Sequence, residues 1–199
     1  MVRLLSALLT ATVVSACSSP PPPEGLENLR APVGVMAQNR VETYTVTGAD
    51  KATMRPQIRV PDETPGAKGY AGYYRYTIAW RYTTKNDRGL CSIDRATVTL
   101  NGTVTIPEWT PPPGVDSQLV ADWSRFRKAL ATHEQGHRAL AYAGAGRVQR
   151  AIERTPSQSC SAIAETVRRT TEPLLEELKQ QQAKYDRDTR HGILQGTRF

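Results

Sequence analysis

The sequence predicts an α+β fold in which an antiparallel β-sheet precedes two helical segments. Between residues 41 and 107 apolar and polar residues alternate, which is typical of strands with one buried face. From residue 116 the apolar residues recur at steps of three and four, as they do on one face of an α-helix. A chain with strands first and helices after has the arrangement of the α+β class.

Three strand segments are expected in the first half. They are VETYTVTG at residues 41–48, YYRYTIAWRYTT at residues 73–84 and ATVTLNGTVTIP at residues 96–107, with an NDRG turn at residues 86–89. The third segment contains Asn-Gly, the strongest short hairpin signal. A hairpin there would mix apolar and polar residues on one face, whereas a continuous strand collects the apolar ones. We therefore expect one long strand.

Two helical segments are expected in the second half. The first begins at a cap formed by Asp116 or Ser117 and runs to about Pro156. The second spans residues 159–184. Within it, Pro173 either kinks the helix or starts a new one after a Thr171 cap.

The first residues have the features of a bacterial lipoprotein export signal. A basic residue and an apolar run lead to the sequence VSAC, which resembles the lipobox whose cysteine carries lipid. We expect a signal peptide at 1–16, a lipidated Cys17 in a Pro-rich tether at 17–35, and one domain at 36–199. The alternative is ordinary cleavage that leaves a free thiol. The lipid would anchor the domain to a bacterial membrane, on the periplasmic side of the outer membrane or at the cell surface.

The two remaining cysteines are Cys91 and Cys160. An exported protein matures in an oxidising compartment, so a disulfide between them is expected. The alternative is a pair of buried free thiols.

The charge of the chain does not indicate a nucleic-acid partner. The formal net charge is +7, but the basic residues are scattered, with no Lys/Arg-rich run and no nucleic-acid-binding motif. Phosphate binding needs a compact basic patch, so a solvated basic surface is the favoured interpretation.

Two of the three histidines lie in the sequence HEQGH at residues 133–137. His133 and His137 are four residues apart and continue the apolar stripe of the helix, so both imidazoles face one interior point. Such a pair is typical of zinc sites, and Glu134 can take a proton from the metal's water as a general base. The alternative is a pair of ordinary histidines beside a solvated glutamate. If buried, however, they would lack hydrogen-bond partners among the neighbouring Leu and Ala residues.

A catalytic zinc needs a third protein ligand and an open position. At about 1.5 Å per residue, an antiparallel return from residue 159 comes level with the two histidines from about residue 179 onward. His191, the remaining histidine, is therefore the expected third ligand, with Asp186, Glu176 and Glu177 as alternatives.

These motifs resemble those of a bacterial family of predicted secreted zinc-dependent proteases that is catalogued as a domain of unknown function. The resemblance covers most of the expected domain and rests on YTVTG, YRYTIAWRY, CSI, IPEW, HEQGH, the later cysteine and YDRDTRHG followed by QG. It supports the roles given to the HEQGH residues. It also implies a second motif made of Tyr185, Asp186, Thr189, His191 and Gly192.

We therefore expect a zincin-like metallohydrolase whose Zn²⁺ is held by His133, His137 and His191. Glu134 is the expected general base. Asp186 is expected to orient a histidine ligand, and Tyr185 is a candidate for stabilising an oxyanion.

The expected substrate is a protein or peptide, and the expected membrane contact is made through the N-terminal lipid. Two alternatives remain: a hydrolase of cell-wall peptides, and a non-catalytic lipoprotein that uses a structural zinc in an interaction module. Glu134 argues against the second alternative, because a structural zinc site has no use for a general base.

Overall fold

The computed structural model of the chain describes residues 29–199 except 62, 64, 65, 67 and 68. The expected signal peptide, Cys17 and most of the tether lie outside the described residues. The elements, in chain order, are β1 (Val35–Thr45), α1 (Lys51–Met54), η1 (Arg55–Gln57), β2 (Tyr73–Asp87), β3 (Leu90–Glu108), α2 (Ser117–Glu153), β4 (Gln158–Ser159), α3 (Ile163–Thr189) and η2 (Ile193–Gln195).

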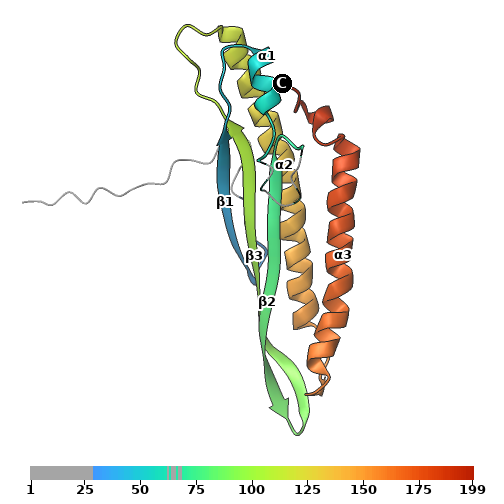
Figure 1. Cartoon of the computed structure of the whole chain (residues 1–199). Coiled ribbons are helices and arrows are strands. Elements are labelled where there is room, and N and C mark those ends of the chain that lie inside the picture. Colours follow the sequence, from blue (N-terminus) through green and yellow to red (C-terminus); the bar gives the residue numbers. More distant parts are fainter. Residues whose placement is uncertain (1–28, 62, 64–65, 67–68) are drawn as a thin grey trace, which may run out of the picture.

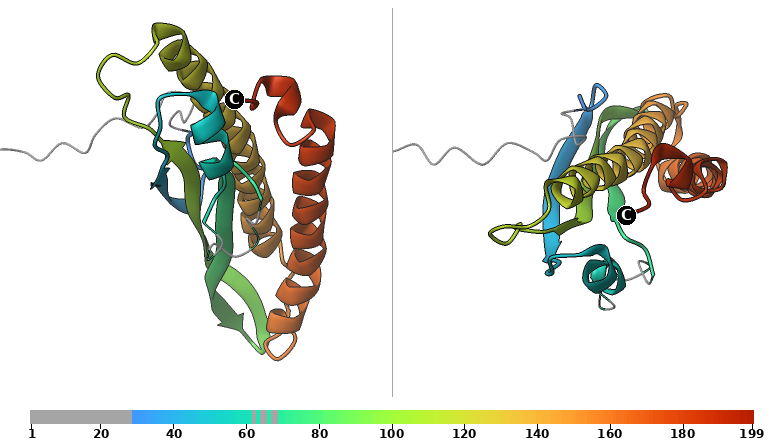
Figure 2. Two further views of the ribbon diagram at one scale, coloured as in Figure 1. Left: turned by 45° about the horizontal axis from the view of Figure 1, so that its top comes forward. Right: turned by 90° about the horizontal axis from the view of Figure 1, so that it is seen from above.

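The elements form three layers, in which α2 lies between the sheet and α3 (Figures 1 and 2). The expected α+β class is confirmed. Among the described residues, no helix is both long and apolar enough to cross a membrane.

The sheet is mixed, with strand order β1-β3-β2 and the short β4 added beside the start of β3. β2 and β3 are antiparallel, but β1 and β3 are parallel, so the expectation of a purely antiparallel sheet was wrong. The reason is the long connection between β1 and β2, which contains α1 and η1. This connection takes the chain away from β1, so that β2 does not pair with β1. The tight β2–β3 hairpin then places β3 between the other two strands.

β3 runs without interruption through Asn101 and Gly102, as expected from the apolar residues that a continuous strand collects on one face. The hairpin turn lies instead at Arg88 and Gly89, which both have positive φ, as two-residue hairpin turns require. Gly102 has a packing role, because a Cβ there would lie 2.3 Å from the Tyr74 hydroxyl. The strongest hairpin signal in the sequence is therefore a packing glycine.

The core lies between the sheet and α2. β3 contributes Val98, Leu100, Val104 and Ile106, all of which are buried as expected. At one end an aromatic cluster joins α2 to the C-terminal residues: Phe199 packs edge-on against Trp123, with ring centroids 5.2 Å apart. Arg55 Nε donates to the Phe199 carbonyl oxygen at 2.8 Å, so the segment after α3 is held against the body of the domain.

The start of α2 agrees with the expectation, whereas α3 differs from it. Asp116 caps α2 by accepting a hydrogen bond from the Gln118 N–H, as expected. α3 is one continuous helix through Pro173, so a new helix after a Thr171 cap was wrong. Thr171 is buried, and its hydroxyl donates to the Val167 carbonyl within the helix. α3 also ends at Thr189, five residues later than expected.

The expected disulfide is present. Cys91, at the start of β3, is bonded to Cys160 in the connection between α2 and α3, 69 residues away in sequence. The same connection pairs with β3 as β4, where Cys91 lies opposite Gln158. The bridge therefore ties the start of the central strand to the point where the chain turns back along α2.

We expect the Cys91→Ser/Cys160→Ser double variant to be less stable than the wild type by about 2–5 kcal/mol, because the bridge restricts a long loop of the unfolded chain. Urea unfolding of both proteins measures the difference. Equal midpoints, or two alkylatable thiols in the unreduced, denatured wild type, would contradict this expectation.

Candidate metal centre

His133, His137 and Asp186 form the one group of metal-ligating side chains found among the described residues. The two histidine Nε2 atoms lie 3.3 Å apart. Asp186 Oδ1 lies 3.3 Å from His133 Nε2 and 3.0 Å from His137 Nε2. Three potential ligand atoms thus form a nearly equilateral triangle.

Two antiparallel helices bring this triangle together. Both histidines lie on α2, and Asp186 lies in the last turn of α3, 49 residues beyond His137. Residues beyond 179 were expected to return to the level of the histidines, and the structure places Asp186 there. Glu176 and Glu177 lie further back on α3, where Glu176 pairs with Lys179 and Glu177 with Gln181.

His191 lies beside the triangle. It follows α3 in a left-handed stretch, in which Arg190 and His191 have φ values of 50° and 51°. Its Nδ1 lies 3.6 Å from Asp186 Oδ1, and its side chain is 53% exposed. Its ring rests near that of Tyr70, with centroids 5.6 Å apart. Asp186, which was expected to orient a ligand, is thus the side chain that completes the triangle.

Glu134 is held beside the histidines at the wall of the site. Only 3% of the residue is exposed, and the Tyr74 N–H at the edge of β2 donates to its carboxylate. Burial raises the pKa of Glu134 to about 7. The carboxyl therefore exchanges its proton near neutral pH, which suits a general base.

The charges of the triangle stabilise one another. Burial on its own would raise the pKa of Asp186, but hydrogen bonds from His133 and His137 lower it below its ordinary value. Burial on its own would lower the pKa of His137, but the hydrogen bonds to Asp186 and Gln182 raise it above its ordinary value. Asp186 is therefore ionised at neutral pH, as a metal ligand must be.

Tyr185 packs against the histidines from the side of the α2 backbone. Its ring stacks on that of His133, with centroids 5.1 Å apart, and meets His137 edge-on at 4.9 Å. Its hydroxyl donates to the His133 carbonyl oxygen at 3.3 Å. A Cβ at Gly136 would lie 2.1 Å from this hydroxyl, so glycine is needed there. In this position Tyr185 supports the histidine rings. It does not line the cavity in front of them.

Two glutamines touch the histidines, and sequence reasoning assigned neither of them a role. Gln182 on α3 contacts His137, and Gln195 on η2 contacts His133. One signal was present for each: Gln182 lies one helical turn before Asp186, and Gln195 belongs to the QG that follows the second motif.

A cavity of about 570 Å³ opens in front of the triangle. α2 contributes Leu130, both histidines and Glu134 to it, while β2 and the preceding residues line one side and α3 the other. His191, Ile193 and Arg198 lie at the end that the C-terminal segment closes. The cavity has room for a ligand larger than a single side chain and gives it access to Glu134 and to the triangle.

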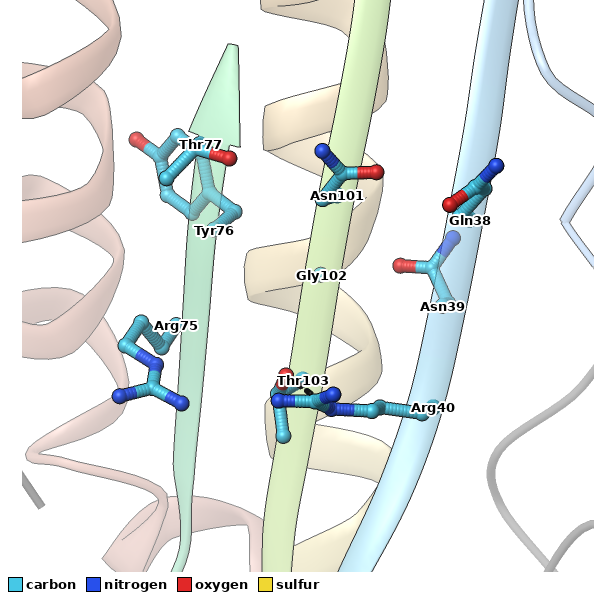
Figure 3. Close-up of a pocket in the computed structure, with 9 residues that line it drawn as sticks. All are labelled: Gln38, Asn39, Arg40, Arg75, Tyr76, Thr77, Asn101, Gly102 and Thr103. Carbon is cyan, nitrogen blue, oxygen red and sulfur yellow. Dashed lines mark hydrogen bonds between the residues drawn. The ribbon is translucent and has the colours of Figure 1, made fainter.

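A second cavity, of about 590 Å³, lies on the sheet face away from α2 (Figure 3). Cross-strand neighbours line it in two rows: Gln38, Asn101 and Thr77, then Arg40, Thr103 and Arg75. Arg40 Nε donates to the Thr103 hydroxyl at 3.1 Å. Its lining has no histidine, cysteine or carboxylate, so acid–base and metal chemistry belong to the first cavity.

In the metal-free protein, Glu134 should make stability fall as the pH rises. Its pKa is about 7 in the folded state against an ordinary 4.5, so between these values the folded state binds more protons than the unfolded state. The free energy of unfolding then decreases across this range, by on the order of 3 kcal/mol for this carboxyl. Urea unfolding at several pH values should show a steeper loss in the wild type than in Glu134→Gln. His137 and Asp186 titrate in both proteins, so parallel curves would contradict the raised pKa.

Comparison with known proteins identifies a family but no activity. No curated protein and no solved structure matches the chain. A family model described as "Bacterial protein of unknown function (DUF922)" matches residues 41–192, which contain the triangle, Glu134 and the disulfide. This match spans more than half of the 199 residues, and the chain therefore belongs to the DUF922 family of bacterial proteins.

Proposed function

We propose that the chain is a zinc-dependent hydrolase whose metal is held by His133, His137 and Asp186. The observation that carries the proposal is the triangle of ligand atoms, with edges of 3.0–3.3 Å. Tetrahedral zinc with bonds of about 2.0–2.1 Å separates its ligands by about 3.3–3.4 Å. The three side chains fit one face of that tetrahedron, and the cavity leaves the fourth position open to solvent or substrate.

Glu134 is the proposed general base. When bound, zinc would act as a Lewis acid toward water and a scissile carbonyl. Glu134 accepts a proton from the attacking water, the new C–O bond forms, and the same proton passes to the leaving nitrogen as the C–N bond breaks. A buried carboxyl with a pKa near 7 can both accept and return this proton at neutral pH.

A peptide is the substrate that the cavity favours. β2 is an edge strand, and within the described part of the chain its outer side has no strand partner. The Tyr74 N–H donates to Glu134, and Tyr73 and Tyr76 also line the cavity, so β2 runs along it. An extended peptide can pair with such an edge and bring its backbone carbonyl to the metal. Export and lipid anchorage at Cys17 belong to this proposal on the strength of the VSAC sequence and the Pro-rich tether.

His191 is the proposed stabiliser of the carbonyl oxygen. With Asp186 as the third ligand, His191 remains half exposed at the cavity, and its Nδ1 faces the same carboxylate. An imidazole N–H in this place can donate to the negative charge that develops during attack. Tyr185, whose hydroxyl is used by the α2 backbone, supports the ligands from behind.

The Glu134→Gln variant should keep zinc and remain folded but lose hydrolysis, because Glu134 acts on water and does not hold the metal. The readouts are zinc content and cleavage of a peptide library by the purified protein. Glu153→Gln, at the far end of the same helix, is the matched control and should retain both. Cleavage by Glu134→Gln at the wild-type rate would rule out its role as base.

Asp186→Ala and His191→Ala separate the two candidates for third ligand. Asp186→Ala should lose zinc, because it removes one of three protein ligands. His191→Ala should keep zinc and lose about 10²–10³-fold in kcat if it stabilises the oxyanion. The reverse pattern, with zinc retained in Asp186→Ala and lost in His191→Ala, would assign the third ligand to His191.

A further inference from the structure

Each histidine of the triangle has its second ring nitrogen against a glutamine oxygen. His137 Nδ1 lies 2.6 Å from Gln182 Oε1. His133 Nδ1 lies 2.9 Å from Gln195 Oε1. A carbonyl oxygen can only accept a hydrogen bond, so each Nδ1 must be the donor if the amides are oriented this way.

The orientation of Gln182 is fixed by a second hydrogen bond. Its Nε2 donates to the His137 carbonyl oxygen at 3.0 Å. A flipped amide would place its oxygen against that carbonyl oxygen and lose this bond, so Oε1 must face the imidazole. One side chain of α3 thus holds both the ring and the backbone of the same α2 residue.

The orientation of Gln195 is fixed through Tyr185. The Tyr185 hydroxyl has one proton and two acceptors within reach, and the His133 carbonyl oxygen at 3.3 Å is closer than Gln195 Oε1 at 3.5 Å. We therefore assign the proton to the hydrogen bond with the His133 carbonyl. The hydroxyl oxygen is then free to accept from Gln195 Nε2, which lies at 3.1 Å. Gln195 Oε1 lies further from the hydroxyl, at 3.5 Å, than from His133 Nδ1. Gln195 therefore donates to Tyr185 and accepts from His133.

We propose that Gln182 and Gln195 are positioning residues that hold both histidines with the proton on Nδ1 before any metal binds. With Nδ1 facing a glutamine, each Nε2 is directed at Asp186, to which it donates in the metal-free protein. Each Nε2 gives up that proton when a metal binds, so the two rings already have the orientation that a metal needs. The proposal uses the metal centre of the proposed function, but its subject is the metal-free chain, so the two can fail separately.

The choice of glutamine over a carboxylate has a physical reason. The centre already contains the carboxyl groups of Glu134 and Asp186, and the first of these is almost fully buried. Two further carboxylates would add like charge that must be desolvated. A neutral amide supplies the same acceptor and sets the same ring orientation without that cost.

The conformation of the C-terminal segment places Gln195 against His133. Three consecutive residues, Arg190, His191 and Gly192, have positive φ and turn the chain back toward α2. A Cβ at Gly192 would lie 3.0 Å from His133 Cγ, so only glycine lets the backbone pass this close to the ring. The aromatic packing of Phe199 then holds the segment in place.

The test is ¹⁵N NMR of histidine-labelled, metal-free protein, which distinguishes the two ring nitrogens. Near neutral pH, both His133 and His137 should carry a proton on Nδ1. Gln182→Met should disturb this pattern at His137 only, and Gln195→Met at His133 only. Gln180→Met, an exposed neighbour on α3, is the matched control and should change neither.

The same variants are tested for zinc affinity. Gln182→Met and Gln195→Met should each bind zinc about 10–100-fold more weakly than the wild type, and Gln182→Glu, which restores an acceptor, should recover the Nδ1–H pattern. Amide spectra confirm that each variant is folded. If a Met variant does not fold, the Glu variant and the wild-type tautomers show whether the glutamines hold the proton on Nδ1. Wild-type histidines protonated on Nε2 alone, or Met variants with unchanged tautomers and affinity, would overturn the proposal. The predicted tautomers without any zinc binding would overturn the proposed function instead.

Discussion

The close approach of α3 to α2 is the contact on which the rest of the site depends. Two glycines of α2 make it possible. A Cβ at Gly144 would lie 2.5 Å from the Leu178 side chain, and one at Gly136 would lie 2.1 Å from the Tyr185 hydroxyl. Because neither glycine carries a side chain, α3 can lie against α2 from the disulfide end to the candidate metal centre. Asp186, Gln182 and Tyr185 then reach the histidines from one helix face.

The same packing removes water from the site on three sides. The sheet edge covers Glu134, the aromatic ring of Tyr185 covers the backbone side of the histidines, and α3 covers the third side. Burial raises the pKa of Glu134, while the histidines keep Asp186 ionised nearby. Two carboxyl groups in one centre thus differ in charge behaviour because their neighbours differ. That difference suits Asp186 to its proposed role as a ligand and Glu134 to its proposed role as a base.

Much of this arrangement was predictable from the sequence, since hydrophobic periodicity and the HEQGH spacing are local properties. The continuous β3 and the inward-facing histidines follow from them. The Asp116 cap follows from the residue type at the start of the helix, and the disulfide follows from a pair of cysteines in a chain with an export signal. The parallel pairing of β1 does not follow from any of these signals, because alternation marks a strand without giving its neighbour.

The helical return predicted the level at which a third side chain meets the histidines. It did not predict which side chain, because α3 continues to Thr189 and Asp186 therefore stays on the helix face toward α2. His191 lies two residues beyond the end of α3, in a left-handed turn. The contact of Gln195 with His133 depends on that turn, which no short-range pattern predicts.

Two imidazoles and one carboxylate form the proposed metal centre, and X-ray absorption at the zinc edge of the zinc-loaded protein can identify these ligands. We expect nitrogen and oxygen ligands at about 2.0–2.1 Å, with the outer-shell scattering of two imidazoles. A spectrum with three imidazoles would contradict the carboxylate ligand. A spectrum with none would contradict the metal centre itself.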